Sequence, residues 1–251
     1  MSDSNNQAPW GASAQPTLVD AGVDAGLRRF MLGVYNKLCL GLILAGGLAW
    51  VVGNVPQVTQ LFFQVQGNHV AVTPLGLVVQ FAPLVMLLFA AFTMRSPTAQ
   101  GANLLYWLVV ASIGLSLGSI FLVYAGVSIA MTFFITAATF GSLSLWGYVT
   151  KRDLSGWGSF LFIALIGIII AMIVNMFLHS AMMDYVVSII GVVIFAGFTA
   201  YDTQKLKIGY YQLKDNQAAL GVMTSWGALN LFLDFINMFL FLLRIFGGGR
   251  R

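Results

Sequence analysis

The sequence contains no glutamate, a single cysteine and few charged residues of any kind. Charged residues make up 8% of the 251 residues, against roughly 25% in a typical soluble domain, so the composition argues strongly against a soluble fold. Cys39 lies inside an apolar run, and as the only cysteine it can form neither an intrachain disulfide nor a cysteine-based metal cluster. We expect Cys39 to be a small buried side chain.

Because glutamate is absent, the carboxylate side chains form a short set. The net charge is +4, but the 12 lysines and arginines lie in small groups between apolar runs rather than along one basic face. This distribution indicates topology signals at a membrane surface and argues against nucleic acid as a partner. The carboxylates are those of Asp3, Asp20, Asp24, Asp153, Asp184, Asp202, Asp215 and Asp234.

The first apolar run begins only near Met31, after a polar stretch of low complexity. A signal peptide would place its charges and its apolar core much closer to Met1. We therefore predict a disordered cytosolic N-terminal tail over residues 1–29 and a transmembrane domain over residues 30–251.

Seven stretches reach or approach the roughly 20 apolar residues that a helix needs to cross the hydrocarbon core. Their patterns are helical or uniformly apolar, without the alternation of a membrane β-barrel. The sequence therefore predicts an all-α integral membrane protein built as a seven-transmembrane-helix bundle. The predicted spans are Met31–Gly53, Leu75–Met94, Asn103–Tyr124, Ile129–Val149, Gly158–Leu178, Tyr185–Gln204 and Gly221–Phe246.

Basic residues occur only in alternate connections between these spans. The loops 54–74, 125–128 and 179–184 contain neither lysine nor arginine, and the positive-inside rule then places the N-terminus in the cytosol. Seven crossings put Arg250 and Arg251 outside, against that rule. Either the first six spans dominate the topology or the last segment enters and returns; we favour a seventh crossing.

Small residues in the third and fourth spans predict points where helices approach one another closely. We assign these residues to packing rather than to chemistry. They are Gly114, Ser116, Gly118, Gly141, Ser142 and Ser144.

The last span carries small and polar residues at intervals of three, four, three and seven, which places them on one face of a helix. Its other faces are apolar and suited to packing or lipid. A carboxylate facing lipid at mid-bilayer would cost at least about 2.5 kcal/mol, so the polar stripe should face the bundle interior or water. The stripe consists of Gly227, Asn230, Asp234, Asn237 and Arg244.

In the sixth span, Ser188, Gly191, Thr199 and Asp202 share a face by the same spacing. Consecutive antiparallel spans can bring the two polar faces together, with Asp234 deeper than Asp202. Two carboxylates that meet at low dielectric cannot easily both be ionised and titrate as a coupled unit. With amide and backbone oxygens they would suit Ca²⁺, and protons would compete with the cation.

Each aspartate also has a plain structural interpretation. Asp234 can be a satisfied core group that accepts hydrogen bonds from Asn230 or Asn237. Asp202, near the predicted end of its span, can simply meet water at the lipid headgroups. Spacing alone does not choose between these interpretations and a functional pair.

The remaining polar candidates are weaker. His69 and His179 fall in predicted external loops, where they are expected to be solvated. Asp184 is predicted to cap the sixth span, and Asp153 to be a surface charge beside two basic residues.

No glycine-rich nucleotide loop, strand-borne nucleophile or zinc-ligand helix motif is present in the sequence. An intramembrane aspartyl protease would also use two facing aspartates, with motifs that resemble Tyr-Asp and Gly-x-Gly-Asp. Tyr201-Asp202 fits the first, but Leu233-Asp234 lacks the second. We therefore predict that the protein is not an enzyme.

Three segments carry a family resemblance: Phe140 to Gly158 (FGSLSLWGYVTKRDLSGWG), Ile190 to Lys205 (IGVVIFAGFTAYDTQK) and Leu229 to Phe246 (LNLFLDFINMFLFLLRIF). Together they resemble the Bax inhibitor-1 (transmembrane Bax inhibitor motif) family in its bacterial branch. The likeness covers nearly everything after the N-terminal tail. It implies a seven-helix bundle whose last helix is enclosed by the other six.

The resemblance also implies a function. Bacterial relatives are described as pH-sensitive calcium leak proteins with a sensor of two aspartates, which map onto Asp202 and Asp234. In their closed form an arginine at the end of span two latches onto the first aspartate, and the matching residue is Arg95. Relatives can pair a span-two glutamate with the arginine that matches Arg244. This chain has no glutamate, so we expect Arg244 to meet water or a lipid headgroup.

The sequence therefore predicts a pH-sensitive Ca²⁺ leak channel of a bacterial cytoplasmic (inner) membrane, with no cofactor other than a transported or bound Ca²⁺. The alternative is a regulatory membrane protein, because some bacterial members resemble modulators of a membrane-bound quality-control protease. The N-terminal tail favours this alternative, since a flexible polar segment is suited to engagement by a partner.

Overall fold

The computed structural model describes residues 18–66, 69–93 and 97–247. Seven helical segments of this part are long and apolar enough to cross a membrane, which confirms the predicted all-α membrane fold. The spans are formed by α1 (Leu18–Asn54), α3 (Pro74–Thr93), α4 (Ala99–Ser116) with its continuation, α6 (Gly126–Val149), α7 (Trp157–Leu178), α8 (Ala181–Leu213) and α9 (Gln217–Phe246).

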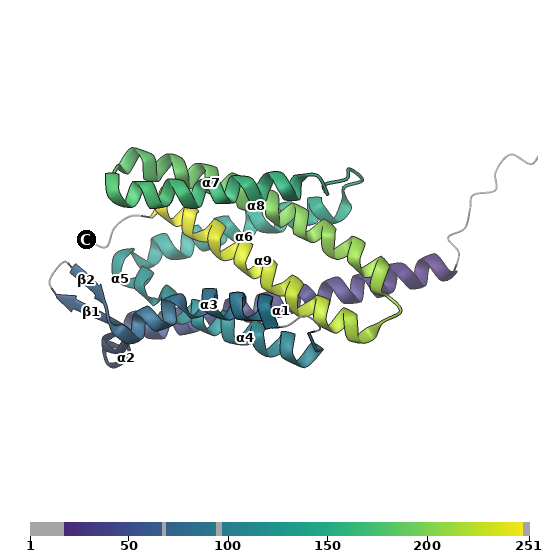
Figure 1. Cartoon of the computed structure of the whole chain (residues 1–251), viewed down its shortest axis with the longest axis horizontal. Helices are drawn as coiled ribbons and strands as arrows, with labels where there is room; N and C mark the ends of the chain where they lie inside the picture. Colours follow the sequence, from purple (N-terminus) through teal and green to yellow (C-terminus); the bar gives the residue numbers. More distant parts are fainter. Residues whose placement is uncertain (1–17, 67–68, 94–96, 248–251) are drawn as a thin grey trace, which may run out of the picture.

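Consecutive spans run antiparallel along the bundle (Figure 1). One end, here termed the basic end, is where α1, α4, α7 and α9 begin, and it carries all described basic residues except Arg244. The opposite end, termed the hairpin end, carries the short helix α2 (Pro56–Phe62) and an antiparallel hairpin of β1 (Phe63–Gln66) and β2 (His69–Val72).

The hairpin was not predicted, and His69 lies at the start of β2 rather than in a loop. Thr59 Oγ1 donates to the carbonyl of Val52 at 2.6 Å, and Phe63 packs in a small buried cluster with the same valine. The alternating sequences on either side of Gly67 would have indicated two short strands. This segment therefore covers the hairpin end of α1.

Two predicted boundaries are wrong. α1 begins at Leu18, so residues 18–29 of the predicted tail are helical. The partner hypothesis rests on the whole tail, of which residues 1–17 lie outside the described residues. α8 continues from the predicted end at Gln204 to Leu213. Its 33 residues rise about 50 Å, well beyond a hydrocarbon core of about 30 Å, because a helix need not end where its apolar run ends.

The helix of the third span is interrupted, which the sequence analysis did not predict. α4 passes into a 3₁₀ turn, η1 (Leu117–Ser119), and then into α5 (Ile120–Val123). A Cβ on Gly118 in this turn would overlap the side chain of Val52 in α1. The turn therefore lies at one of the close contacts between the third span and α1.

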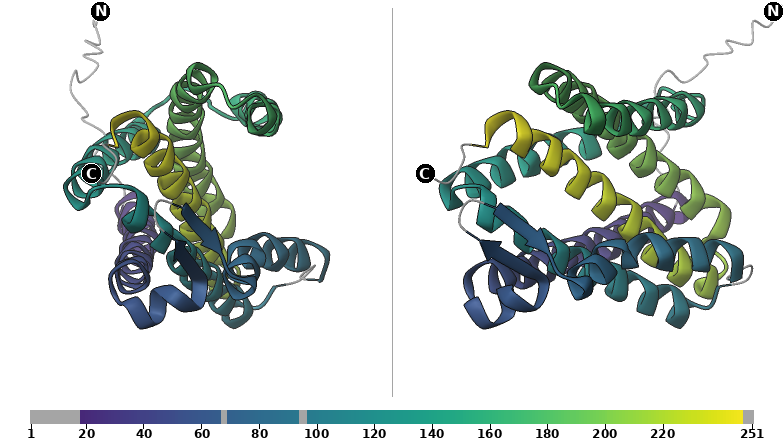
Figure 2. Two further views of the ribbon diagram at one scale, coloured as in Figure 1. Left: turned by 90° about the vertical axis from the view of Figure 1, so that its left-hand side faces the viewer. Right: turned by 60° about the vertical axis from the view of Figure 1, so that its left-hand side comes forward.

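α9 lies at the centre of the bundle (Figures 1 and 2). In its most apolar window 61% of the residues are buried, whereas the other spans reach 11% to 33%. It packs mainly against α1, α4, α6 and α8, so the expected central last helix is confirmed, but four helices rather than all six make most of its surroundings. The apolar faces of α9, which could have packed or faced lipid, are packed. Since α9 is one unbroken helix from the basic end to the hairpin end, the enter-and-return alternative is wrong.

Short polar side chains cap the N-termini of several helices. Thr98 and Asn216 accept hydrogen bonds from the backbone N–H groups of Gly101 and Ala219 at 3.1 and 3.0 Å, as N-caps do. The N-cap of α8 is Ser180, so the prediction of Asp184 as its cap is wrong. Asp184 lies in the first turn of α8, where the positive end of the helix dipole favours a carboxylate.

Glycines mark the close helix contacts, but not always the predicted ones. A Cβ on Gly114 would lie 2.7 Å from the Cα of Ala45, as expected for a close α1–α4 contact. Gly141 faces open space, and the close α6–α8 contact is made by Gly147, whose Cβ would overlap the carbonyl oxygen of Ala200. The fourth span therefore packs on α8 through the face of Gly147 and of the predicted Ser144, whose Oγ lies 2.9 Å from Thr203 Oγ1, and not through Gly141.

These two glycines give a matched test of packing. We expect Gly147→Ala to lower the free energy of unfolding in detergent by about 1–3 kcal/mol, because α6 must move away from the α8 backbone. Gly141→Ala, on the same helix, should leave stability unchanged or raise it by about 0.5–1 kcal/mol through helix propensity. Thermal unfolding of both variants measures the difference, and equal melting temperatures would contradict the assigned contact.

Candidate functional site

The candidate site lies between α8 and α9, whose contacts fix their relative register. A Cβ on Gly191 would lie 2.6 Å from the ring of Phe241, and one on Gly227 would overlap the side chain of Leu206. Antiparallel helices in this register place Asp202 level with about Asn230. Asp234 then lies about one turn, or roughly 5.4 Å, deeper in the bundle.

Asp234 is one of the few charged side chains in the core. It is only 6% exposed, and within the described residues its Oδ2 has no hydrogen-bond partner. The amide of Asn237 donates to the carbonyl of Leu233 at 2.8 Å instead, so it does not satisfy this oxygen. The simple interpretation of Asp234 as a fully satisfied core group is therefore not supported.

The carboxylate of Asp202 is close enough for its charge to act on Asp234. Asp202 is partly buried, and its nearest basic influence is Lys205, one turn later on α8. Because α8 continues past this point, Asp202 is not at a helix end. Asp202 of α8 and Asn230 of α9 line the same space between these helices, so the two predicted polar faces lie toward each other there.

A small cavity connects Asp202 with the basic end. Its volume is about 170 Å³, and it lies between α8 and α9. A larger cavity of about 450 Å³ shares Lys205 and Met223 with it and reaches the connection between α6 and α7 through Ser155. The small cavity is lined by Asp202, Lys205, Leu206, Met223, Trp226, Gly227 and Asn230.

Lys37 was predicted only as a topology signal, yet it joins three helices at the basic end. Its Nζ donates to Asn103 Oδ1 of α4 at 2.5 Å and to Ser225 Oγ of α9 at 2.7 Å, and it lies 5.0 Å from the ring centre of Tyr106. The sequence could have indicated this role, because an ionisable side chain within an apolar span usually has a specific partner. Ser225 precedes Asp234 by about 13 Å of helix, so Lys37 does not neutralise that aspartate.

At the hairpin end Arg244 has a partner that the sequence did not indicate. Its Nη1 lies 3.6 Å from Asp184 Oδ1, in a cavity of about 300 Å³ that Tyr124, Met172 and Asn175 also line. Arg244 is partly exposed, as expected, but in place of the missing glutamate it has Asp184 as an ion-pair partner. The two side chains are 39% and 50% exposed, so the ion pair contributes little to stability, about 0–1 kcal/mol.

Between the two ends the core around α9 is closed. Met238, Phe239, Leu242 and Leu243 are all buried, and they separate Asp234 from Arg244. Polar cavities thus lie at each end of α9, with an apolar section between them.

Two further predictions concern ligands of the aspartates. Arg95, the expected latch, lies outside the described residues. No group of three or more His, Cys, Asp or Glu residues able to hold a metal occurs in the part of the chain that the structure describes. A cation at Asp202 and Asp234 would therefore need amide, backbone or water oxygens as additional ligands, as hard cations readily accept.

Gln204, two residues after Asp202, has a role that spacing did not indicate. Its Oε1 accepts from the N–H of Leu154 at 2.8 Å, and its Nε2 donates to the carbonyl of Arg152 at 2.7 Å. This 7% exposed amide thereby fixes the connection between α6 and α7 to α8. Together with Thr203, whose Oγ1 lies 2.9 Å from Ser144 Oγ, it holds three elements beside Asp202.

Comparison with known proteins identifies the chain's relatives. A family model described as "Inhibitor of apoptosis-promoting Bax1" matches residues 27–251. An uncharacterised protein of Caulobacter vibrioides is 54% identical over 232 residues, which cover 92% of this chain and 93% of the relative. The inner membrane protein YbhL of Escherichia coli is 46% identical over 227 residues, 90% of this chain and 94% of YbhL.

The connection held by Gln204 can be tested by proteolysis. Trypsin cleaves after lysine and arginine, and Lys151 and Arg152 lie in this connection. Gln204→Leu leaves two backbone groups without their partners, which costs about 1–2 kcal/mol, so cleavage there should become roughly 5- to 30-fold faster. Gln212→Leu, at an exposed position of the same helix, is the control and should cleave like the wild type; no difference between the two would contradict the assignment.

Proposed function

The chain belongs to the Bax inhibitor-1 family of membrane proteins, and from this premise we propose that it is a proton-regulated cation leak. Asp202 and Asp234 are the groups that bind protons and cation, and Ca²⁺ is the cation that best matches their oxygen ligands. The observation that carries the proposal is the buried carboxylate of Asp234, with an oxygen that has no hydrogen-bond partner within the described residues.

The energetics support competition between a proton and a cation at this carboxylate. A buried charge without a partner is unfavourable by several kcal/mol in a membrane interior. Either a proton or a cation removes that cost, and Asp202 adds a second negative charge nearby. Occupancy by one therefore opposes occupancy by the other.

Few other charged groups act on the pair from the helices packed around α9. Lys37 of α1 is engaged by Asn103 and Ser225. Lys207 of α8 donates to the carbonyl of Tyr148 at 2.9 Å. Lys205 acts on Asp202 and borders the cavity through which a cation would reach it. Within the part of the chain that the structure describes, the balance at the pair is thus between two carboxylates and one nearby lysine.

The proposed path begins at the basic end and passes the cavity of about 170 Å³ beside Asp202. It continues past Asn230 to Asp234 and then meets the apolar section around Phe239 and Leu243. In this closed conformation that section is the barrier. Conduction requires α9 to move relative to its neighbours, and it would end at the cavity of Asp184 and Arg244.

We further propose that the basic end faces the cytosol of a bacterial cell and that the protein resides in its inner membrane. The positive-inside rule supports the orientation, since Arg244 is the one lysine or arginine described at the hairpin end. Arg250 and Arg251, which oppose it, lie outside the described residues. The printed name of the Escherichia coli relative, an inner membrane protein, supports the location.

Calcium flux into liposomes tests the leak and its regulation. We expect wild-type flux to depend on pH, and its midpoint to move to lower pH as calcium rises, because bound cation stabilises the ionised carboxylates. Asp234→Asn should remove the pH dependence and Asp202→Asn should alter its midpoint. Asp153→Asn is the control, since hydrogen bonds from the Ser155 hydroxyl and N–H lower the pKa of Asp153 at the surface.

Three results would count against the proposal. Flux equal to that of empty liposomes at every pH would exclude a leak. A pH midpoint that does not change with calcium concentration would exclude competition at one site. An Asp153→Asn effect as large as that of Asp234→Asn would assign the pH dependence to surface charge.

A further inference from the structure

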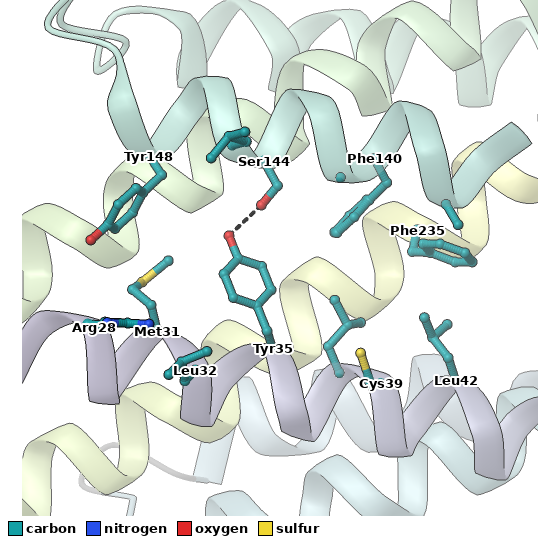
Figure 3. Close-up of a pocket in the computed structure, with 14 residues that line it drawn as sticks. Arg28, Met31, Leu32, Tyr35, Cys39, Leu42, Phe140, Ser144, Tyr148 and Phe235 are labelled. Carbon is teal, nitrogen blue, oxygen red and sulfur yellow. Dashed lines mark hydrogen bonds between the residues drawn. The ribbon is translucent and has the colours of Figure 1, made fainter. Parts of the chain in front are cut away.

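A groove between α1 and α6 lies apart from the cavities beside Asp202 (Figure 3). Its volume is about 560 Å³, and most of its lining is apolar. Figure 3 shows Arg28 and Tyr148 at one end of the groove and Phe140 and Phe235 toward the other. Phe235 belongs to α9, so the floor of the groove is part of the central helix.

The groove opens sideways from the bundle. Leu32 on one rim is 51% exposed and Leu145 on the other is 63% exposed. Cys39, predicted to be buried, is exposed and lines the same groove. Because α1 and α6 both span the membrane, this opening faces the hydrocarbon chains of the bilayer.

The groove is long enough to hold an acyl chain that spans one leaflet of the bilayer. Its lining on α1 extends from Arg28 to Leu42, a rise of about 21 Å. Half of a hydrocarbon core of about 30 Å is about 15 Å. A groove that starts at the basic end therefore reaches past the depth of a single acyl chain.

The polar end of the groove carries positive charge. Arg28 is exposed there, and Lys207 lies behind Tyr148, with its Nζ 5.5 Å from the centre of the ring. Among the residues whose side chains the structure describes, none that lines the groove is acidic. Deeper inside, the Tyr35 hydroxyl is hydrogen-bonded to Ser144, which is itself bonded to Thr203, so these polar groups are already satisfied by the protein.

We propose that this groove binds one anionic phospholipid. The phosphate lies at the guanidinium of Arg28, which suits a phosphate through paired hydrogen bonds. One acyl chain lies along the groove between α1 and α6 and ends against Phe235. An apolar groove that is open to the bilayer excludes water, and the charge at its basic end selects an anionic headgroup over a zwitterionic one.

Two pairs of variants separate the groove from the rest of the surface. A Cβ on Gly141 meets no atom within 4 Å, so Gly141→Leu fills the groove without a clash; Gly167→Leu, also in open space but on α7, is its control. Arg28→Gln removes the headgroup contact, and Arg29→Gln, at the adjacent exposed position, is its control.

Native mass spectrometry of delipidated protein titrated with phosphatidylglycerol or phosphatidylcholine of the same chains measures the binding. Wild type, Gly167→Leu and Arg29→Gln should bind one phosphatidylglycerol in preference to phosphatidylcholine. Gly141→Leu and Arg28→Gln should bind it roughly tenfold or more weakly. In the wild type, phosphatidylglycerol should also slow alkylation of Cys39, the only thiol in the chain.

Equal phosphatidylglycerol binding by Gly141→Leu and Gly167→Leu would overturn the groove as the site. Equal binding of the two lipids by the wild type, or no effect of Arg28→Gln, would overturn the anionic headgroup. Melting temperatures of all four variants identify any that fail to fold, and Cys39 alkylation of the unaltered protein tests the groove without a substitution. Calcium flux enters none of these measurements, so the lipid site stands or falls independently of the leak.

Discussion

A carboxylate on a membrane-spanning helix cannot face hydrocarbon without a cost of at least a few kcal/mol, so Asp234 requires that α9 be shielded from lipid. The helices α1, α4, α6 and α8 pack around α9 and provide this shielding. Enclosure requires small residues where α8 and α9 touch, as at Gly191 and Gly227. It also leaves α7 at the periphery, where only 11% of the apolar window is buried (Figure 2).

The parts of this arrangement that depend on local sequence could be predicted. Apolar length identified seven spans, and three- and four-residue spacing placed Asp234 and Asn230 on one face. The cost of an exposed carboxylate then required an interior position for that face. The placement of Asp202 and Asp234 on neighbouring helices also followed, because consecutive spans are antiparallel and in contact. The resemblance to a known family supplied the enclosed last helix.

The remaining features depend on which face of a helix meets which neighbour, and spacing does not specify this. Gly141 and Gly147 are both small residues of one helix, but they are six positions apart and point about 120° away from each other. Only Gly147 contacts α8. An apolar neighbourhood likewise does not distinguish a side chain inside the bundle from one that faces lipid, so Cys39 was assigned wrongly. Arg244 and Asp184 are distant in sequence and meet because α8 and α9 pack antiparallel, with the start of α8 beside the end of α9.

Besides lining the site, α8 holds the α6–α7 connection through Gln204. Its two hydrogen bonds join the backbone at Arg152 and Leu154 to a point two residues from Asp202. Any axial movement of Asp202 that leaves these bonds intact must carry the connection with it. The positions of Lys151 and Arg152 in this connection therefore depend on the position of Asp202 inside the bundle. A movement of the aspartate along the bundle would displace these two residues at its basic end.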